Sequence, residues 1–352
     1  MICKKIFSSV ASMIKVLILT LVLTNSNSDE NITKKLSYDQ GILSLMYHRF
    51  NENEYPSTNV KMEIFKKQIQ TIKKNQYAFI NPDEFTKEFS NVKNDKKILI
   101  TIDDGFQSFY EIAWPYLKRN KIPFILFIST EPVGKNGYMN WSQIKEIEKE
   151  SFAFIGNHSH KHDYFIDHNY DYFKEDINKS IEIFKKKIGY NPEFFSYPFG
   201  EYSLKHKEFI KTKFQFAFGQ NSGVIDLNKD KFEIPRFPIN EKYGDIERFK
   251  FLINLLPLEY DDVSIKDNLI LPKNNPPNLT IKFFEGQKNL DKINCFSDEG
   301  KGWEKTDLTL IKNKLIVKFR DKFKFRRGRI NCSMKDDEVW RWFGLQFSIK
   351  QT

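Results

Sequence analysis

Short apolar runs alternate with amphipathic segments from residue 41 to about residue 257. The apolar runs are nearly continuous and end in polar or turn-forming residues. They are GILSLMYHRF (41–50), KKILITIDDG (96–105), IPFILFIST (122–130), FAFIGNHS (152–159), FFSYPFG (194–200), FQFAFG (214–219) and IPRFPI (234–239). Continuous apolar runs of this length predict strands that are buried on both faces, as in a parallel sheet.

The segments between these runs have the spacing of amphipathic helices. In the clearest one, 173–189, the residues Ile177, Ile181, Phe184 and Ile188 fall on one face. Further helices are expected around 65–72 and at 107–120, 141–150, 203–213 and 245–256. Repeated strand-then-helix units predict an α/β fold in which helices wrap a mainly parallel sheet, either open or closed into a barrel. In both cases, chemistry collects at the carboxyl ends of the strands.

The pattern changes at the breaker-rich stretch NNPPN (274–278). Beyond it, strands without convincing helices are expected at LTIKFF (279–284), LTLIKNKLIVKF (308–319) and VWRWFGLQFSI (339–349). We therefore expect a larger α/β domain at 41–260 and a small all-β, sandwich-like domain at 275–352. The basic run KFKFRRGR (322–329) alternates with Phe and suits a half-exposed strand.

The N-terminus has the order of a secretory signal peptide. Lys4 and Lys5 precede an interrupted apolar run whose best part is VLILTLVL (16–23), and small polar residues follow. We assign 1–28 to the signal and 29–40 to a polar linker, and we expect export to the periplasm or cell envelope. The continuous run is shorter than the ~20 residues that a membrane span needs, although an uncleaved anchor stays open.

Charge and cysteine content narrow the partners and the environment. The formal net charge of +10 suits an anionic surface such as the cell envelope. Because Lys and Arg are scattered among Asp and Glu, the charge pattern does not predict a nucleic-acid partner. Without the signal peptide, only Cys295 and Cys332 remain. In an exported protein this even count can form a disulfide, and two separate buried thiols are the alternative.

Polar clusters follow two of the predicted strands. Asp103 and Asp104 are adjacent carboxylates, which repel each other unless a cation or an arginine lies beside them; an Asp-Gly turn with solvated acids is the alternative. The segment NHSHKHD holds His158, His160 and His162, half of the 6 histidines of the chain. Two His and one carboxylate are a typical catalytic metal site with a position open for water, whereas a solvated His cluster is the alternative.

Three of these stretches, TIDDG (101–105), HSHKH (158–162) and YPFG (197–200), together resemble the motifs of the polysaccharide deacetylases of the NodB-homology type, carbohydrate esterase family 4. The resemblance covers about residues 40–257. The opening MYHRF (46–50) is similar to the branch that deacetylates poly-N-acetylglucosamine. The resemblance implies a deformed (β/α) barrel and a divalent metal ion, expected to be Zn²⁺, held by one Asp and two His.

The resemblance also implies individual roles. The metal ligands of the family match Asp104, His158 and His162, and its general base matches Asp103. The metal would activate a water molecule and polarise the acetyl carbonyl, while Asp103 takes the proton of the water. The family pattern further implies that the backbone N–H of Phe199 stabilises the oxyanion.

Two departures from the family pattern shift further roles to other residues. Ser196 stands where the family has an Arg two residues before the Pro, so we expect Arg236 to orient Asp103; a surface or structural ion pair is the alternative for Arg236. The last third of the chain contains no histidine, so the late His motif of the family is missing. We assign the general acid to His48, with a structural histidine as the alternative. His160 is expected to lie outside the ligand set.

These inferences predict an exported, metal-dependent enzyme that hydrolyses the N-acetyl groups of an amino-sugar polysaccharide, such as poly-N-acetylglucosamine or peptidoglycan. Two alternatives stay open. One is a carbohydrate O-acetyl esterase on the same scaffold, which amide and ester substrates would distinguish. The other is a degenerate, non-catalytic carbohydrate-binding protein of the cell envelope, which a measurement of bound metal would distinguish.

Overall fold

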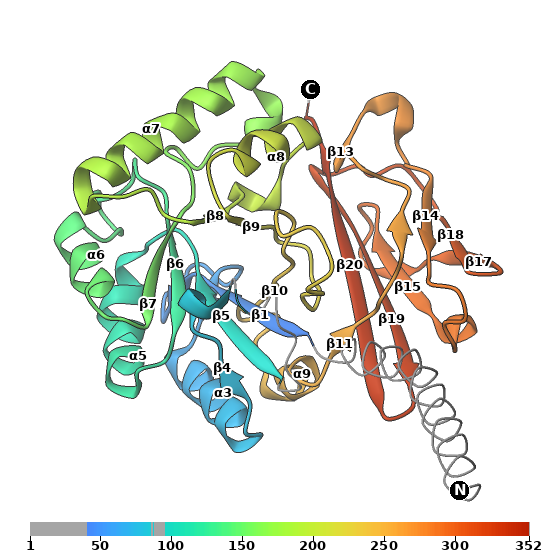
Figure 1. Cartoon of the computed structure of the whole chain (residues 1–352), viewed down its shortest axis with the longest axis horizontal. Helices are drawn as coiled ribbons and strands as arrows, with labels where there is room; N and C mark the ends of the chain where they lie inside the picture. The colour runs from blue at the N-terminus through green and yellow to red at the C-terminus, as the bar shows by residue number, and fades with distance from the viewer. Residues whose placement is uncertain (1–40, 86, 88–95, 352) are drawn as a thin grey trace, which may run out of the picture. The chain divides into compact units, whose positions relative to one another are not determined.

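The computed structural model describes residues 41–85, 87 and 96–351. Its largest sheet has the strand order β10-β1-β5-β6-β7-β8-β9, with β4 also beside β5, and all its pairings are parallel (Figure 1). The strands are β1 (Ile42–Tyr47), β4 (Ala78–Phe79), β5 (Lys97–Ile102), β6 (Phe124–Ile128), β7 (Ala153–Asn157), β8 (Phe194–Ser196), β9 (Phe216–Phe218) and β10 (Phe237–Pro238). The short strands β2 (Arg49–Phe50) and β3 (Asn59–Val60) pair separately.

One segment joins the two edges of this sheet. Phe218 of β9 pairs in parallel with Ile234, and three residues further on Phe237 of β10 pairs with Leu45 of β1. Helices surround the curled sheet in Figure 1. They are α3 (Met62–Lys74), α5 (Trp114–Asn120), α6 (Trp141–Glu148), α7 (Tyr170–Ile188), α8 (Leu204–Lys211) and α9 (Ile246–Leu252). The predicted deformed (β/α) barrel is therefore confirmed.

Strand side chains alternate between the barrel interior and the surrounding helices. In β5, Ile100 packs in the cluster that includes residues of α3 and α6. Leu99 packs instead with Phe127 and Phe218 from other strands of the sheet. Because side chains alternate with a period of two, Asp103 continues the inward face of Leu99 past the end of the strand. The strand therefore directs this carboxylate into the mouth of the barrel.

The helix expected at 107–120 has two parts. It starts as a wider π-helical turn at Phe109–Ala113 and continues as α5. Pro115 lies in the first turn of α5. Proline has no N–H to donate to the preceding turn, so it is accommodated at the start of a helix and not in its interior.

The C-terminal region forms two further sheets around a shared core. One has the order β11-β20-β19-β15-β16, with β13 also beside β20, and the other has the order β12-β14-β18-β17. The strands are β11 (Leu256–Pro257), β12 (Asp262–Val263), β13 (Leu269–Ile270), β14 (Leu279–Lys282), β15 (Asn294–Asp298), β16 (Glu304–Lys305), β17 (Asp307–Ile311), β18 (Lys314–Lys318), β19 (Arg327–Asp336) and β20 (Val339–Ile349). Ile281 and Val317 of one sheet share a hydrophobic cluster with Ile330 and Phe347 of the other, so the two sheets form a sandwich.

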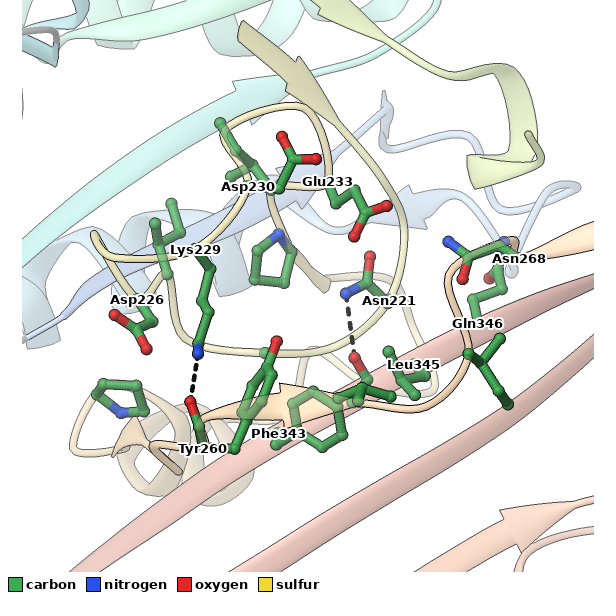
Figure 2. A pocket seen from close by; sticks show the side chains of 18 of the residues that line it. Asn221, Asp226, Lys229, Asp230, Glu233, Tyr260, Asn268, Phe343, Leu345 and Gln346 are labelled. Carbon is green, nitrogen blue, oxygen red and sulfur yellow. Dashed lines mark hydrogen bonds between the residues drawn. The ribbon is translucent and has the colours of Figure 1, made fainter. Parts of the chain in front are cut away.

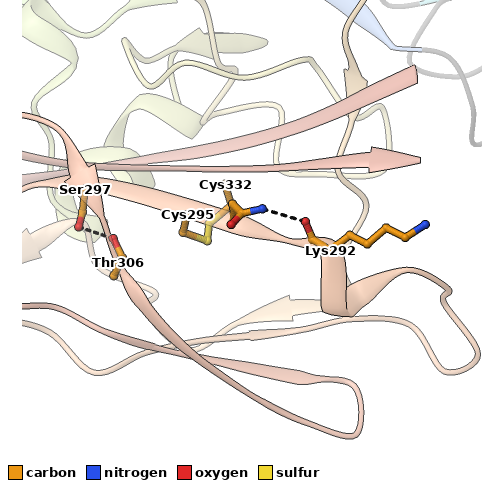
Figure 3. The surroundings of a disulfide bond; sticks show 6 residues. Lys292, Cys295, Ser297, Thr306 and Cys332 are labelled. Atoms are coloured by element: carbon orange, nitrogen blue, oxygen red, sulfur yellow. Dashed lines mark hydrogen bonds between the residues drawn. A yellow bond between two sulfur atoms is a disulfide. The ribbon is translucent and has the colours of Figure 1, made fainter. Parts of the chain in front are cut away.

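A disulfide joins two neighbouring strands of this sandwich. Cys295 of β15 and Cys332 of β19 are directly opposite each other and are bonded (Figure 3). Both side chains are fully buried. Of the two possibilities for these cysteines, a disulfide or two separate thiols, the structure therefore contains the disulfide.

The basic run at 322–329 is only partly a strand, which corrects the expectation for it. β19 begins at Arg327, and residues 322–325 are irregular. The backbone N–H of Phe323 bonds to the side-chain Oδ1 of Asn275 and not to a neighbouring strand, so no ladder forms there.

The structure does not test the predicted signal peptide and linker or the predicted division into domains. The predicted signal peptide and linker, residues 1–40, are outside them. Within residues 41–85, 87 and 96–351, no helix combines the length and the apolar character that crossing a membrane requires. The division of the chain at 41–260 and 275–352 stays a prediction about independent domains.

Candidate active site

Asp103 is fully buried and forms a bidentate ion pair with Arg236. Nη1 of Arg236 lies 2.6 Å from Oδ1 of Asp103, and Nη2 lies 2.8 Å from Oδ2. The guanidinium also donates through Nε to the carbonyl of Gly219 and through its two Nη atoms to the hydroxyls of Thr101 and Ser196. Because a guanidinium is planar, these five hydrogen bonds hold the carboxylate in one orientation.

The charge state of Asp103 follows from this pairing. Burial alone would raise the pKa of the Asp103 carboxyl, but the charge of Arg236, with a smaller contribution from His158, lowers that pKa below its ordinary value. Asp103 is therefore a carboxylate at neutral pH, although its side chain has no contact with bulk solvent.

Asp104, His158 and His162 converge next to this pair. Oδ1 of Asp104 lies 3.4 Å from Nε2 of His158 and 3.2 Å from Nε2 of His162. One ligand atom from each residue lies within 4.8 Å of the other two. Asp104 follows β5 and His158 follows β7 directly. The cluster thus forms at the carboxyl ends of the strands, the edge at which barrel enzymes of this class collect their reactive groups.

Two atoms of this cluster are buried and have no hydrogen-bond partner among the described residues, namely Oδ1 of Asp104 and Nε2 of His158. Nδ1 of His158 donates to the carbonyl of Ser196 at 2.7 Å, which leaves Nε2 as the nitrogen whose lone pair a neutral imidazole offers to the cluster. Two buried acceptors that face each other cannot bond to each other, whereas a cation would satisfy both. The residues present therefore fit a divalent metal ion held by two imidazoles and one carboxylate.

Several residues at this site have a strained backbone. Asp104, Ser159, His162 and Phe199 have φ values of 74°, 73°, 55° and 58°, in the left-handed region that favours glycine. Such conformations cost about 1–3 kcal/mol each and persist where the surrounding contacts impose them. These strained residues all lie in or beside the cluster.

The cluster is reachable from solvent. An open pocket of about 450 Å³ is lined by Asp104 and His162 together with Ser129, Tyr138 and Lys161. Asp103 and His158 are fully buried and do not line this pocket, so Asp104 and His162 are the members of the cluster that a molecule in the pocket meets.

His48 and Phe199 lie near the same cluster. His48 follows β1, and its pKa is lowered by burial, an effect that the nearby carboxylates of Asp104 and Asp103 oppose only in part. Phe199 lies in the tight turn η4 (Pro198–Gly200) after β8. Its ring centroid is 4.5 Å from that of His162. The structure thus brings residues from four strand ends to one site.

His160 lies outside this cluster. Its Nδ1 is 2.8 Å from Oγ1 of Thr130, and its backbone N–H donates to Asp176 at 2.7 Å. The backbone N–H of Lys161 also donates to Asp176, at 3.0 Å. The carboxylate of Asp176 therefore helps to shape the loop that presents the two histidines on either side.

Sequence reasoning missed the hydroxyl groups that complete the Arg236 site. Thr101 opens the TIDDG stretch and Ser196 directly precedes YPFG, but no local pattern marks either hydroxyl as a partner of Arg236. A usable signal is the period of two in β5, which places Thr101 on the same inward face as Asp103.

Comparisons with known proteins agree with this geometry. The family model for polysaccharide deacetylase matches residues 90–214. A poly-beta-1,6-N-acetyl-D-glucosamine N-deacetylase from Staphylococcus epidermidis is 27% identical over 262 residues, which cover 63% of this chain and 90% of the relative. An enzyme of the same name from Staphylococcus aureus (strain N315) is 26% identical over 246 residues, covering 61% of this chain and 85% of the relative.

Two solved structures share the fold. IcaB from Ammonifex degensii superposes with a TM-score of 0.53 at 23% identity, over 61% of this chain and 97% of that one. The Streptococcus pyogenes deacetylase PplD in complex with acetate superposes with a TM-score of 0.53 at 21% identity, over 58% of this chain and 95% of that one. Residues 90–214 of the barrel thus match the polysaccharide deacetylase family.

Proposed function

We propose that this chain is a metal-dependent N-deacetylase that hydrolyses N-acetyl groups of an N-acetylglucosamine-containing polysaccharide and releases acetate. The observation that carries the proposal is the ionised, arginine-paired carboxylate of Asp103 directly beside the cluster of Asp104, His158 and His162. The names of the two curated relatives favour poly-β-1,6-N-acetylglucosamine as the polymer, and peptidoglycan is the second polymer to test.

Asp104, His158 and His162 would hold the metal ion. A set of two imidazoles and one carboxylate favours Zn²⁺. When bound, such an ion lowers the pKa of water and polarises a carbonyl group. The hydrogen bond from His158 to the Ser196 carbonyl fixes the imidazole so that Nε2 faces the metal position.

Asp103 would accept the proton of the attacking water. Its ion pair with Arg236 keeps it ionised and oriented, which is the task that the family assigns to an arginine at the position of Ser196. In this chain Ser196 instead accepts a hydrogen bond from Arg236. The missing arginine at 196 therefore gives no support to a degenerate site.

Phe199 and His48 would complete the reaction. The backbone N–H of Phe199 would donate to the oxyanion, where a donor held in place in advance is most effective. His48 would protonate the departing amine. Because burial lowers its pKa, His48 is neutral at rest, and it would become an acid only after taking up a proton released in the addition step.

The test is acetate release from β-1,6-linked N-acetylglucosamine oligomers and from peptidoglycan fragments, with and without a chelator. We expect release from at least one substrate, loss with the chelator and loss in Asp103→Asn. Asp245→Asn is the matched control, because Asp245 caps α9, and asparagine caps a helix as well as aspartate. Metal-loaded protein that releases no acetate from any of these substrates would refute the proposal.

An O-acetyl esterase on the same scaffold would use the same groups, because the base and the metal position serve esters and amides alike. Matched sugars that carry O-acetyl or N-acetyl groups distinguish the two activities. A preference for the ester of about a hundredfold or more in kcat/KM, beyond that expected for the easier leaving group, would favour the esterase.

We also propose export of the chain to the periplasm or cell envelope, on the basis of the lysines and the apolar run before residue 28. N-terminal sequencing of the protein from its source would identify the mature end. An end near residue 28 in the envelope or medium supports the proposal. An intact N-terminus in the membrane fraction would instead favour an anchor, and an intact N-terminus in the cytosol would exclude export.

A further inference from the structure

The sandwich reaches the turn that carries the proposed oxyanion donor. Nε2 of Gln346, in β20, donates to the carbonyls of Phe199 and Gly200, both at 2.9 Å. Gln346 is only 4% exposed. Its Oε1 accepts a bond from Nε of Arg329, its directly opposite neighbour in β19. Because Arg329 occupies the amide oxygen, the NH₂ group of Gln346 faces the turn.

This turn depends on outside support because of its conformation. Phe199 has φ 58° and ψ 4°, a left-handed conformation that side chains rarely adopt. Gly200 has φ +67°, and a Cβ there would lie 2.7 Å from the backbone N of Gln220 and 2.9 Å from Nε2 of Gln346. Two hydrogen bonds from one amide therefore hold a strained backbone against relaxation.

A second contact from the sandwich supports the Phe199 side chain. The guanidinium of Arg326 lies 4.0 Å from the centre of the Tyr164 ring. The Tyr164 ring in turn stacks on Phe199, with centroids 4.1 Å apart and planes inclined by 14°. Nη2 of Arg326 also forms an ion pair with Oδ2 of Asp167, at 2.5 Å. The result is a row of contacts from Arg326 through Tyr164 and Phe199 to His162, in which the last pair of rings meets edge to face at 70°.

A contact of the sandwich with another part of the barrel lies away from the Phe199 turn. Figure 2 shows the cavity of about 400 Å³ between β20 and the loop 221–235, where Nδ2 of Asn221 donates to the carbonyl of Gly344. Gln346 lies at one end of this cavity. The Gln346 and Arg326 contacts differ from the Asn221 contact, because they end on residues next to the metal-binding cluster.

We propose that the sandwich is a working part of the active site, in which Gln346 and Arg326 are positioning residues that fix the Phe199 turn and thereby its N–H donor. The inference rests on the proposed deacetylase function. Both contacts come from the longest strands of the sandwich or their immediate vicinity, because Gln346 is in β20 and Arg326 directly precedes β19.

The test replaces Gln346 by Glu, which keeps the shape of the side chain and removes the amide donor. We expect kcat to fall about tenfold or more while KM changes by less than about threefold, because orientation is lost and not substrate affinity. Gln287→Glu is the matched control, since Gln287 also donates to a backbone carbonyl but within the sandwich, at Glu259. This control should keep the kcat of the unmodified chain.

Hydrogen–deuterium exchange of the amides at 197–202 gives a readout that does not depend on turnover. We expect faster exchange there in Gln346→Glu and in Arg326→Lys, which keeps the charge of the side chain but not its planar stacking, and no change in Gln287→Glu. Unchanged exchange and unchanged kcat in both variants would overturn the proposal. If the unmodified chain releases no acetate, the proposed function fails, while the exchange data still decide whether the sandwich holds the turn.

Discussion

Replacing Arg236 by methionine should strongly destabilise the folded protein, because Asp103 would remain buried and ionised without its counter-ion. The two side chains have no exposed area, and both carboxylate oxygens bond to the guanidinium at 2.6 and 2.8 Å. With charge centres about 4 Å apart and an effective dielectric constant of about 20, the lost attraction is about 4 kcal/mol. This agrees with the ~3–5 kcal/mol observed when one partner of a buried ion pair is removed.

The double variant Arg236→Met with Asp103→Asn separates this effect from a packing defect. With both charges removed, no uncompensated ion remains, so we expect recovery of at least about 2 kcal/mol relative to Arg236→Met. The free energies of unfolding are measured by guanidinium denaturation in a chelator, so that metal binding does not contribute. A loss below about 1 kcal/mol in Arg236→Met, or a double variant that is no more stable than this single variant, would refute the reasoning.

Four further outcomes are expected. Asp103→Asn should lower kcat at least about a hundredfold with bound metal unchanged, measured by acetate release and elemental analysis; full turnover would rule out its role as the base. Asp104→Ala should lose both metal and activity, and chelation of the unmodified chain should do the same until Zn²⁺ is restored; metal retained by Asp104→Ala would exclude it as a ligand. Replacing Cys295 and Cys332 by serine should lower the unfolding free energy by about 4 kcal/mol in the chain-entropy model, because the disulfide spans a sequence separation of 37; a loss below about 1 kcal/mol in denaturant would contradict that model. Burial, which outweighs the attraction of nearby arginines, raises the pKa of Glu201 from 4.5 to about 7, so the folded state binds a proton that the unfolded state releases. The unfolding free energy should therefore fall relative to Glu201→Gln as the pH rises from about 4.5 to about 7, and a difference that is constant with pH would disprove this shift.

The strand positions could be predicted because each apolar run is a local pattern. The run at 96–105 contains β5 at Lys97–Ile102, and the run at 122–130 contains β6. Both faces of these strands are buried, so apolar residues are continuous along them. Strand ends were less accurate in the basic run at 322–329, where a side chain distant in sequence takes the backbone N–H that a strand would use.

The members of the site could be named from the sequence, but their mutual arrangement could not. Asp104, His158 and His162 stand out as unusual polar groups after apolar runs. The prediction that Arg236 pairs with Asp103 was based only on the missing arginine at position 196. The two partners are 133 residues apart in the sequence. No local pattern encodes a contact across that separation.

By itself, the sequence determined the alternation of strands and helices, the position of the reactive residues at strand ends and the change to all-β structure near the C-terminus. These features depend on the order of apolar and polar residues along a short segment, which is visible in the chain. Only the tertiary structure decided that Ser196 and Thr101 complete the Arg236 site, and that Gln346 and Arg326 reach the Phe199 turn. Those contacts arise when the barrel closes and the sandwich packs beside it, so they depend on the three-dimensional path of the backbone. The period of two in β5 places Thr101 on the face of Asp103, but no local pattern identifies the partner that these residues meet.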